Sequence, residues 1–150
     1  MVIRKAEISD IGAVADLVRG LSTFYLEEGG STLPTWFKAT LSDAAFVGRF
    51  VDSEFHNYVA EHNGSIVGYI SIKDGFHLYH LFVSSKYHKQ GIAKSLWRHC
   101  VKVLTIDQCT VRSSLYAVPV YSKFGFSLTE DIEYKDGIAF QAMVYKGVAG

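Results

Sequence analysis

Cysteine, proline and net charge are all scarce in this chain of 150 residues. It holds two cysteines and two prolines, and 15 Lys and Arg balance 15 Asp and Glu. Cys100 and Cys109 lack the spacing of a metal site or a redox pair, so we expect free, buried thiols, no chemical role for them and no metal ion. The neutral balance gives no overall field that would attract nucleic acid, so any anion site must be local.

Long hydrophobic runs are also missing. The segment Met1 to Lys5 has no apolar core of a secretory signal, and no apolar run approaches the roughly 18 residues that a membrane helix needs. We therefore expect a cytoplasmic protein without a membrane partner. What the chain does contain is 49% hydrophobic and 14% aromatic residues, enough to fill a substantial core. Because there are no repeats or linkers, residues 1–150 are predicted to form a single domain.

Hydrophobic periodicity predicts alternating strands and helices in the first half of the chain. We expect a strand over Val2–Ala6, a helix capped by Asp10, and a second helical segment starting near Pro34. Strands over Tyr58–Glu61 and Ile66–Ile72 flank an Asn-Gly pair, which is typical of a tight hairpin turn. The apolar face of the first helix is predicted to be Ile11, Val14, Ala15, Val18 and Leu21.

The second half continues the alternation and ends in an antiparallel pair. In order, the expected elements are a strand over Phe76–Val83, a helix from about Gly91 to Leu104, a short strand over Gln108–Arg112, a helix capped by Ser113 or Ser114 and ended by Gly125, and paired strands over Phe126–Leu128 and Ile138–Tyr145. One face of the long helix is apolar, so that helix is predicted to cover a sheet.

The most informative stretch lies where the strand ending at Val83 turns into the long helix. This turn is basic and contains Gly91, and a turn of that kind directs several backbone N–H groups toward one space at the positive end of a helix dipole. Lys86, Lys89 and Lys94 add local positive charge. The turn is therefore predicted to hold phosphate.

Two motifs, one in this turn and one further along the chain, resemble motifs of the GNAT superfamily of N-acetyltransferases. The predicted order of strands and helices is also similar to the order in the GNAT fold along the whole chain. The residues from His88 to Ala93 look like the family's acetyl-CoA loop, Arg/Gln-x-x-Gly-x-Gly/Ala, with His88 where Arg or Gln is usual. Ala117-x-x-x-Tyr121-x-x-x-Gly125-Phe126 looks like the family's Ala-x-x-x-Tyr-x-x-x-Gly-Phe. Found in order, each at a strand–helix boundary, the two motifs are difficult to obtain by chance.

The resemblance implies an α/β fold of the GNAT type, with a mixed, mostly antiparallel central sheet, helices on both faces and splayed fourth and fifth strands. Acetyl-CoA would be the cosubstrate, paired with the fourth strand at a bulge near Leu81, where the N–H of Phe82 or Val83 would face the acetyl carbonyl. Arg112 stands where the family often carries an Asn. The cofactor-binding residues that the resemblance implies are Leu81, Phe82, Val83, His88, Lys89, Gln90, Gly91, Ile92, Ala93, Lys94, Arg112, Ser114, Ala117 and Lys123.

Acetyl transfer from a thioester to an amine needs a neutral amine, a polarised carbonyl and a proton for the departing thiolate. By the same resemblance, the Tyr121 hydroxyl would donate that proton. His77 matches a strand position where some family members carry a catalytic Glu and is the candidate base; His80, expected to be buried and hydrogen-bonded, and water are the alternatives. The resemblance places the acceptor pocket under residues 22–53, where Glu27 or Glu28 could attract a cationic amine.

Together these patterns predict an acetyl-CoA-dependent N-acetyltransferase that acts by direct transfer in a ternary complex. The expected acceptor is a primary amine on a small molecule. An acceptor amine on a nucleic-acid-bound protein is less expected, because no part of this chain is strongly basic or tail-like. Two alternatives stay open, a non-catalytic CoA-binding domain and a domain that binds no CoA. A homodimer is also open, because the apolar final strand and the second helical segment could serve an interface or the core.

Overall fold

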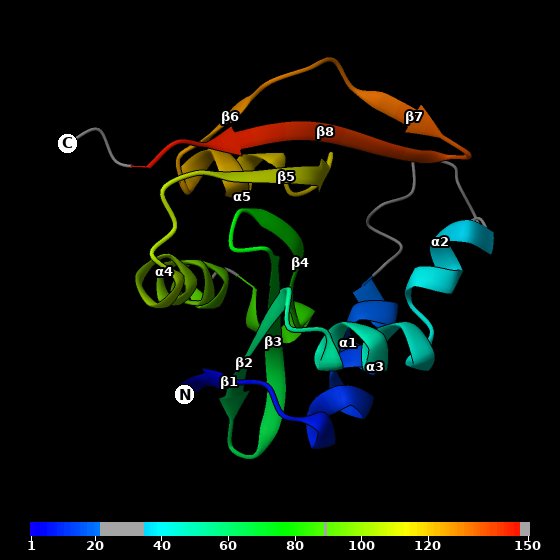
Figure 1. The fold of residues 1–150 in the computed structure, drawn as a ribbon, viewed down its shortest axis with the longest axis vertical. Coiled ribbons are helices and arrows are strands. Elements are labelled where there is room, and N and C mark those ends of the chain that lie inside the picture. Colours follow the sequence, from blue (N-terminus) through cyan, green and yellow to red (C-terminus); the bar gives the residue numbers. More distant parts are fainter. Residues whose placement is uncertain (22–34, 89, 148–150) are drawn as a thin grey trace.

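The computed structural model describes residues 1–21, 35–88 and 90–147, and in it a twisted eight-stranded sheet separates two groups of helices (Figure 1). The strands are β1 (Val2–Lys5), β2 (Phe55–His62), β3 (Ser65–Lys73), β4 (His77–Val83), β5 (Cys109–Ser114), β6 (Phe126–Leu128), β7 (Glu133–Lys135) and β8 (Ile138–Tyr145). The helices are α1 (Ile11–Leu21), α2 (Thr35–Thr40), α3 (Asp43–Val51), α4 (Ile92–Leu104) and α5 (Val118–Lys123). The strands lie in the order β1-β2-β3-β4-β5-β8-β6, and β7 pairs with β8.

The predicted element order and GNAT-type α/β fold are confirmed, with differences in short elements. The second helical segment is two helices, because the Ser42 side chain accepts a hydrogen bond from the Ala45 backbone N–H at 3.1 Å and starts α3. Strand β7 was not predicted, since its three residues are exposed and show no apolar alternation. It forms a hairpin with β8 through Asp136 and Gly137, both at positive φ.

The start of α1 also differs from the prediction that Asp10 caps it. A short 3-10 helix, Ile8–Asp10, leads into α1, and Glu7 occupies its N-cap position. The buried Asp10 carboxylate instead accepts the Glu7 N–H at 2.7 Å and pairs with Arg4 at 2.8 Å. The hydrogen bonds from Arg4 lower the pKa of Asp10. The predicted apolar face of α1 is confirmed, since its five residues are all buried.

Helices α4 and α5 cover one face of the sheet, and α1, α2 and α3 cover the other (Figure 1). On the α4 side, a Cβ added to Gly68 of β3 would lie 3.0 Å from Leu96 and 3.1 Å from Ile92, so glycine there allows α4 to approach the sheet closely. Cys100 and Cys109 are buried in the same core and are free, as predicted, and burial raises the pKa of both thiols to about 12.

The sheet opens between β4 and β5, as the resemblance implies. Their parallel pairing joins His77 to Thr110 and Leu78 to Val111, and in the described chain it continues no further along β4. The expected bulge lies earlier than predicted: the register against β3 shifts so that Tyr79, and not Leu81, is the extra residue. Because of that shift, Tyr79 and His80 both contact α3: the Arg49 guanidinium lies 5.2 Å from the Tyr79 ring centroid, and Phe46 stacks on the His80 ring.

The final strand contributes to the chain's own core. Five apolar side chains of β8 are buried within the chain, namely Ile138, Ala139, Phe140, Met143 and Tyr145. The expectation of a homodimer stays a prediction. Among the helices that the structure describes, none is long and apolar enough to cross a membrane.

Candidate active site

The predicted phosphate turn has the backbone geometry that the prediction requires. Gly91 is the N-cap of α4 and adopts a left-handed conformation, with φ 79° and ψ 10°. Among the residues that the structure describes, no side chain caps this end of α4, and a Cβ added at Gly91 would meet nothing within 4 Å. The first turn of α4 therefore presents its backbone N–H groups to open space, which suits the pyrophosphate of CoA.

The unusual His88 ties this turn to the end of β4. Its Nε2 lies 2.7 Å from the Val83 carbonyl oxygen, so the ring donates the hydrogen bond from that nitrogen. The ring thus fixes the turn that precedes Gly91.

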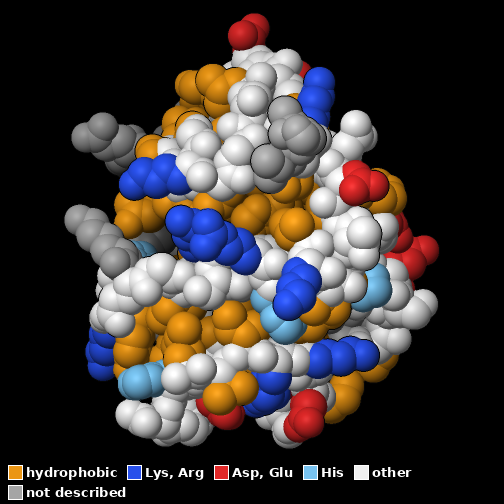
Figure 2. All heavy atoms as spheres, turned by 90° about the vertical axis from the view of Figure 1, so that its left-hand side faces the viewer, with side chains coloured by type: hydrophobic (Ala, Val, Ile, Leu, Met, Phe, Trp, Pro, Cys, Tyr) orange, Lys and Arg blue, Asp and Glu red, His pale blue; other side chains and the backbone are white. Residues whose placement is uncertain are grey.

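The other predicted cofactor-binding residues near this turn differ in their exposure to solvent. Gln90 and Lys94 are exposed, Leu81 and Ala93 are half-buried, and Ile92 is buried in the core beneath α4. Lys89 lies outside the described residues. Figure 2 shows Lys and Arg side chains spread over the face that carries α4, with Asp and Glu mostly toward its edges.

The second motif forms the start and the buried face of α5. The Ser114 hydroxyl accepts a hydrogen bond from the Ala117 N–H at 3.2 Å, and Ala117 is the N-cap of α5. Tyr121 is 5% exposed and packs against the ring of Phe126, with centroids 5.4 Å apart. Lys123 is exposed at the last position of the helix. Tyr121 therefore belongs to the same side of the sheet as α4.

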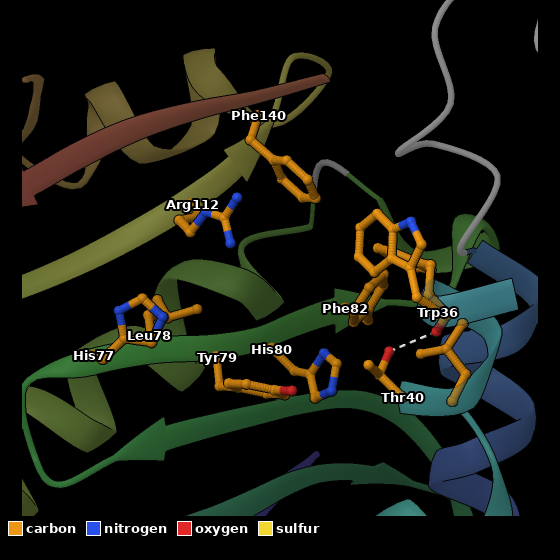
Figure 3. Close-up of a pocket in the computed structure, with 11 residues that line it drawn as sticks. Trp36, Thr40, His77, Leu78, Tyr79, His80, Phe82, Arg112 and Phe140 are labelled. Carbon is orange, nitrogen blue, oxygen red and sulfur yellow. Dashed lines mark hydrogen bonds between the residues drawn. The ribbon is translucent and has the colours of Figure 1, made fainter. Parts of the chain in front are cut away.

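A pocket of about 150 Å³ lies on the opposite side of β4, between β4, β5, β8 and α2 (Figure 3). Its lining residues are Trp36, Phe37, Thr40, Leu41, His77, Leu78, Tyr79, His80, Phe82, Arg112 and Phe140. Sequence reasoning gave no signal for Thr40, Tyr79 and Phe140, since only the fold brings them together. The expected position of Glu27 and Glu28 lies outside the described residues.

His77 lies in this pocket and is held by β5. Its Nδ1 is 2.7 Å from the Thr110 hydroxyl oxygen, and the same two residues are paired between β4 and β5. Burial, together with the positive charges of Lys73 and Arg112, lowers the pKa of His77 below its ordinary value of 6.5. His77 is therefore neutral at neutral pH, the state in which imidazole can accept a proton.

His80 is buried, which confirms one part of the prediction. The other part, that its ring is hydrogen-bonded, is wrong. Among the described residues neither ring nitrogen has a partner, because the neighbouring groups are aromatic rings. Phe46 stacks on the His80 ring with centroids 5.8 Å apart, and Tyr79 lies edge-on at 4.7 Å. Burial, with a smaller effect of Arg49, lowers the pKa of His80 well below its ordinary value. His80 is thus a second neutral imidazole beside the pocket.

Arg112 lies in this pocket, on the α1–α3 side of the sheet. Its guanidinium stacks over Phe140, 4.5 Å from the ring centroid, and contacts Glu133 at 3.3 Å. In Figure 3 its side chain extends from β5 into the space above β4. The cofactor turn and the pocket lie on opposite sides of the splayed β4, and the cofactor role that the resemblance implies for Arg112 stays a prediction.

Strand β4 connects the two parts of the site. Phe82 lines the pocket, and the next residue, Val83, begins the turn that leads to Gly91. Past Leu78, the edge of β4 that faces β5 is free of strand pairing in the described chain. A thioester arm paired with this edge would place its acyl carbon between the cofactor turn and the pocket.

Comparison with known proteins agrees with this geometry. The family model described as acetyltransferase (GNAT) domain matches residues 23–146. No curated protein sequence matches the chain. The chain belongs to the GNAT acetyltransferase family.

Solved structures with the same fold include several acetyltransferases of this family. The paiA N-acetyltransferase of Thermoplasma acidophilum, in complex with coenzyme A, has a TM-score of 0.79 at 21% identity, covering 97% of this chain and 98% of that one. The ribosomal-protein-S18-alanine N-acetyltransferase of Escherichia coli has a TM-score of 0.71 at 18% identity, covering 99% and 96%. An aminoglycoside 6'-N-acetyltransferase complexed with coenzyme A has 0.71 at 14%, covering 100% and 99%. At these identities the likeness concerns the fold.

Proposed function

We propose that this protein is an acetyl-CoA-dependent N-acetyltransferase that transfers the acetyl group directly to a primary amine of a small molecule in a ternary complex. The observation that carries the proposal is the opening of the sheet at β4, with an uncapped helix end on one side and a pocket containing His77 on the other. In this proposal, residues 1–150 form one domain, and the protein is located in the cytoplasm.

The proposed binding uses backbone groups first. The N–H groups at the start of α4 hold the pyrophosphate, with Gly91 leaving the necessary space and Lys94 adding charge. The unpaired edge of β4 holds the pantetheine arm, and an N–H of Phe82 or Val83 polarises the acetyl carbonyl. Bound acetyl-CoA supplies an activated acyl carbon.

The proposed reaction then requires two proton transfers. His77 accepts a proton from the attacking amine while the new C–N bond forms. The C–S bond breaks, and the Tyr121 hydroxyl gives its proton to the departing CoA thiolate, so that the products are an amide and free CoA. His80 is the alternative base, because its ring is also neutral and also lines the pocket.

The experiment that tests the proposal is a calorimetric titration with acetyl-CoA and then CoA, followed by assays of free-thiol release. The assays use a panel of amino acids, polyamines, aminoglycosides and peptides. Binding with amine-dependent thiol release supports the enzyme, whereas binding without release on any amine favours the non-catalytic CoA-binding domain. The absence of binding would contradict both.

A further inference from the structure

The pocket between β4 and α2 has a positive character that membership in the family does not specify. Its described lining side chains include one arginine, Arg112, and two histidines, and no carboxylate. Lys73 and Arg112 both act on His77 as positive charges, and Arg49 acts likewise on His80. An acceptor made only of cationic groups, such as a polyamine, is poorly matched to such surroundings.

Arg49 strengthens this positive character from beneath the pocket. The residue is 7% exposed, its guanidinium donates to the Thr40 carbonyl oxygen at 2.6 Å, and it stacks 4.5 Å from the Phe46 ring centroid. None of the described Asp or Glu side chains forms an ion pair with it. A buried charge without a counter-ion acts over a longer range than an exposed one, because water screens it less.

Arg112 is the group in the pocket that can bind an anion directly. Its contact with Glu133 is a single one at 3.3 Å, between side chains that are 53% and 59% exposed, so it is weak. The guanidinium fork prefers two parallel hydrogen bonds to one carboxylate. A carboxylate that enters the pocket can therefore take the place of Glu133 on Arg112.

The remaining walls of the pocket are largely aromatic. Trp36 and Phe37 come from α2, Phe82 from β4 and Phe140 from β8 (Figure 3). The Trp36 ring is fixed by a hydrogen bond from its Nε1 to Asp136 at 2.8 Å. The aromatic walls of this pocket of about 150 Å³ suit a small apolar group.

We propose, on the basis of the function proposed above, that the acceptor is an α-amino acid with an apolar side chain, whose carboxylate binds Arg112 and whose side chain packs among the aromatic residues of the pocket. Arg112 is then a specificity-determining residue. The amine of such an acceptor faces the two neutral imidazoles, His77 and His80, at the β4 side of the pocket.

The test compares each apolar L-amino acid with its own carboxamide in the thiol-release assay. The two compounds have the same side chain and the same amine position. The amine of the amide is less basic, so a larger fraction of it is neutral and able to attack, and amine reactivity alone would make the amide the better acceptor. We expect the acid to have the higher kcat/KM, by about 10- to 100-fold, because a charge-assisted bidentate contact is lost in the amide. Equal rates, or a preference for amides, polyamines or aminoglycosides, would overturn the proposal.

Variants of the ion pair sharpen this test in opposite directions. Arg112→Gln should remove the preference for the acid, while Glu133→Gln should raise kcat/KM for the acid a few-fold by releasing the guanidinium. If Glu133 instead attracted a cationic acceptor, Glu133→Gln would lower kcat/KM, which would contradict the assignment. Arg98→Gln, which removes an exposed cation of α4 far from the pocket, is the matched control and should change neither ratio.

A binding measurement separates this inference from the proposed function. Trp36 lines the pocket, so the binding of L-phenylalanine or L-leucine to the CoA-loaded protein should change its fluorescence, and Trp36→Phe should abolish that signal. Binding of the acid that is lost in Arg112→Gln, without thiol release, would support the pocket assignment while the proposed reaction fails. If neither amino acid binds or is acetylated, the inference is wrong.

Discussion

The two sides of β4 achieve binding in different ways. On the α4 side, the site consists of a left-handed glycine, an uncapped helix end and an unpaired strand edge, all of which are backbone features. On the α2 side, it consists of side chains from four elements, among them Trp36, His77 and Arg112. Backbone features depend little on side-chain identity, and this turn has its left-handed glycine with His88 where the family usually carries Arg or Gln. The ligand preference of a pocket formed by side chains depends on which residues line it.

This contrast indicates which part of the protein carries the family's common chemistry and which part carries what is particular to this chain. Any protein that binds the same cosubstrate can keep one backbone arrangement. The acceptor differs from protein to protein, and it must be recognised by charge and shape. The four predictions below test whether the two sides can be altered independently.

The largest effect is expected from Tyr121→Phe on the α4 side. If Tyr121 protonates the departing thiolate, kcat should fall by about 10²–10⁴-fold, while the affinity for acetyl-CoA stays nearly unchanged. Steady-state kinetics together with calorimetry measure both quantities. Unchanged turnover would remove Tyr121 from the reaction.

Gly91→Glu should break cofactor binding and leave the pocket intact. It places a negative side chain in the open space beside the helix end, and we expect the Kd for CoA to rise by roughly 10²-fold or more. Gly64→Ala is a useful control, because Gly64 has the same left-handed conformation, with φ 80°, in the β2–β3 turn, and a side chain there causes similar backbone strain. Tight CoA binding by Gly91→Glu would show that this turn does not hold the phosphates.

On the pocket side, His77→Ala should lower kcat/KM by roughly 10²-fold at neutral pH and remove the acidic limb of the pH profile. In the unaltered protein, the midpoint of that limb should lie below pH 6.5, because burial and positive neighbours lower the pKa of His77. Arg112→Gln should move the midpoint upward. An unaltered limb in His77→Ala would transfer the role of base to His80 or water.

The smallest expected effect is on stability. His80→Phe replaces two buried, unpartnered nitrogens by an aromatic edge, and should raise the free energy of unfolding by about 1–2 kcal/mol at pH 7.5 in urea titrations. The pKa of His80 is lower in the folded protein than in the unfolded chain. Below pH 6.5, His80 is therefore protonated in the unfolded chain but stays neutral in the folded protein, so the free energy of unfolding decreases as the pH falls. The gain from His80→Phe should therefore be larger at pH 5.5. A loss of stability in His80→Phe would point to a partner for the ring.

The sequence predicts the fold well because its regular patterns are local. The apolar face of α1, the Asn63-Gly64 turn and the helix that begins after Gly91 all depend on residues close in the chain. The misplaced features depend on contacts between one element and another. Asp10 pairs with Arg4 instead of capping α1, and the bulge at Tyr79 follows from the register of β4 against β3.

The sequence by itself determined the turn at Gly91 and the helix motif around Tyr121, because spacing along one chain segment is enough to define both. Only the tertiary structure decided what surrounds His77, His80 and Arg112. Their partners come from α2, α3, β5, β7 and β8, and the bulge decides which side of the sheet a β4 residue faces. A one-residue shift in a strand reverses the direction of each side chain beyond it. The alternation of apolar and polar residues in the sequence does not predict that shift.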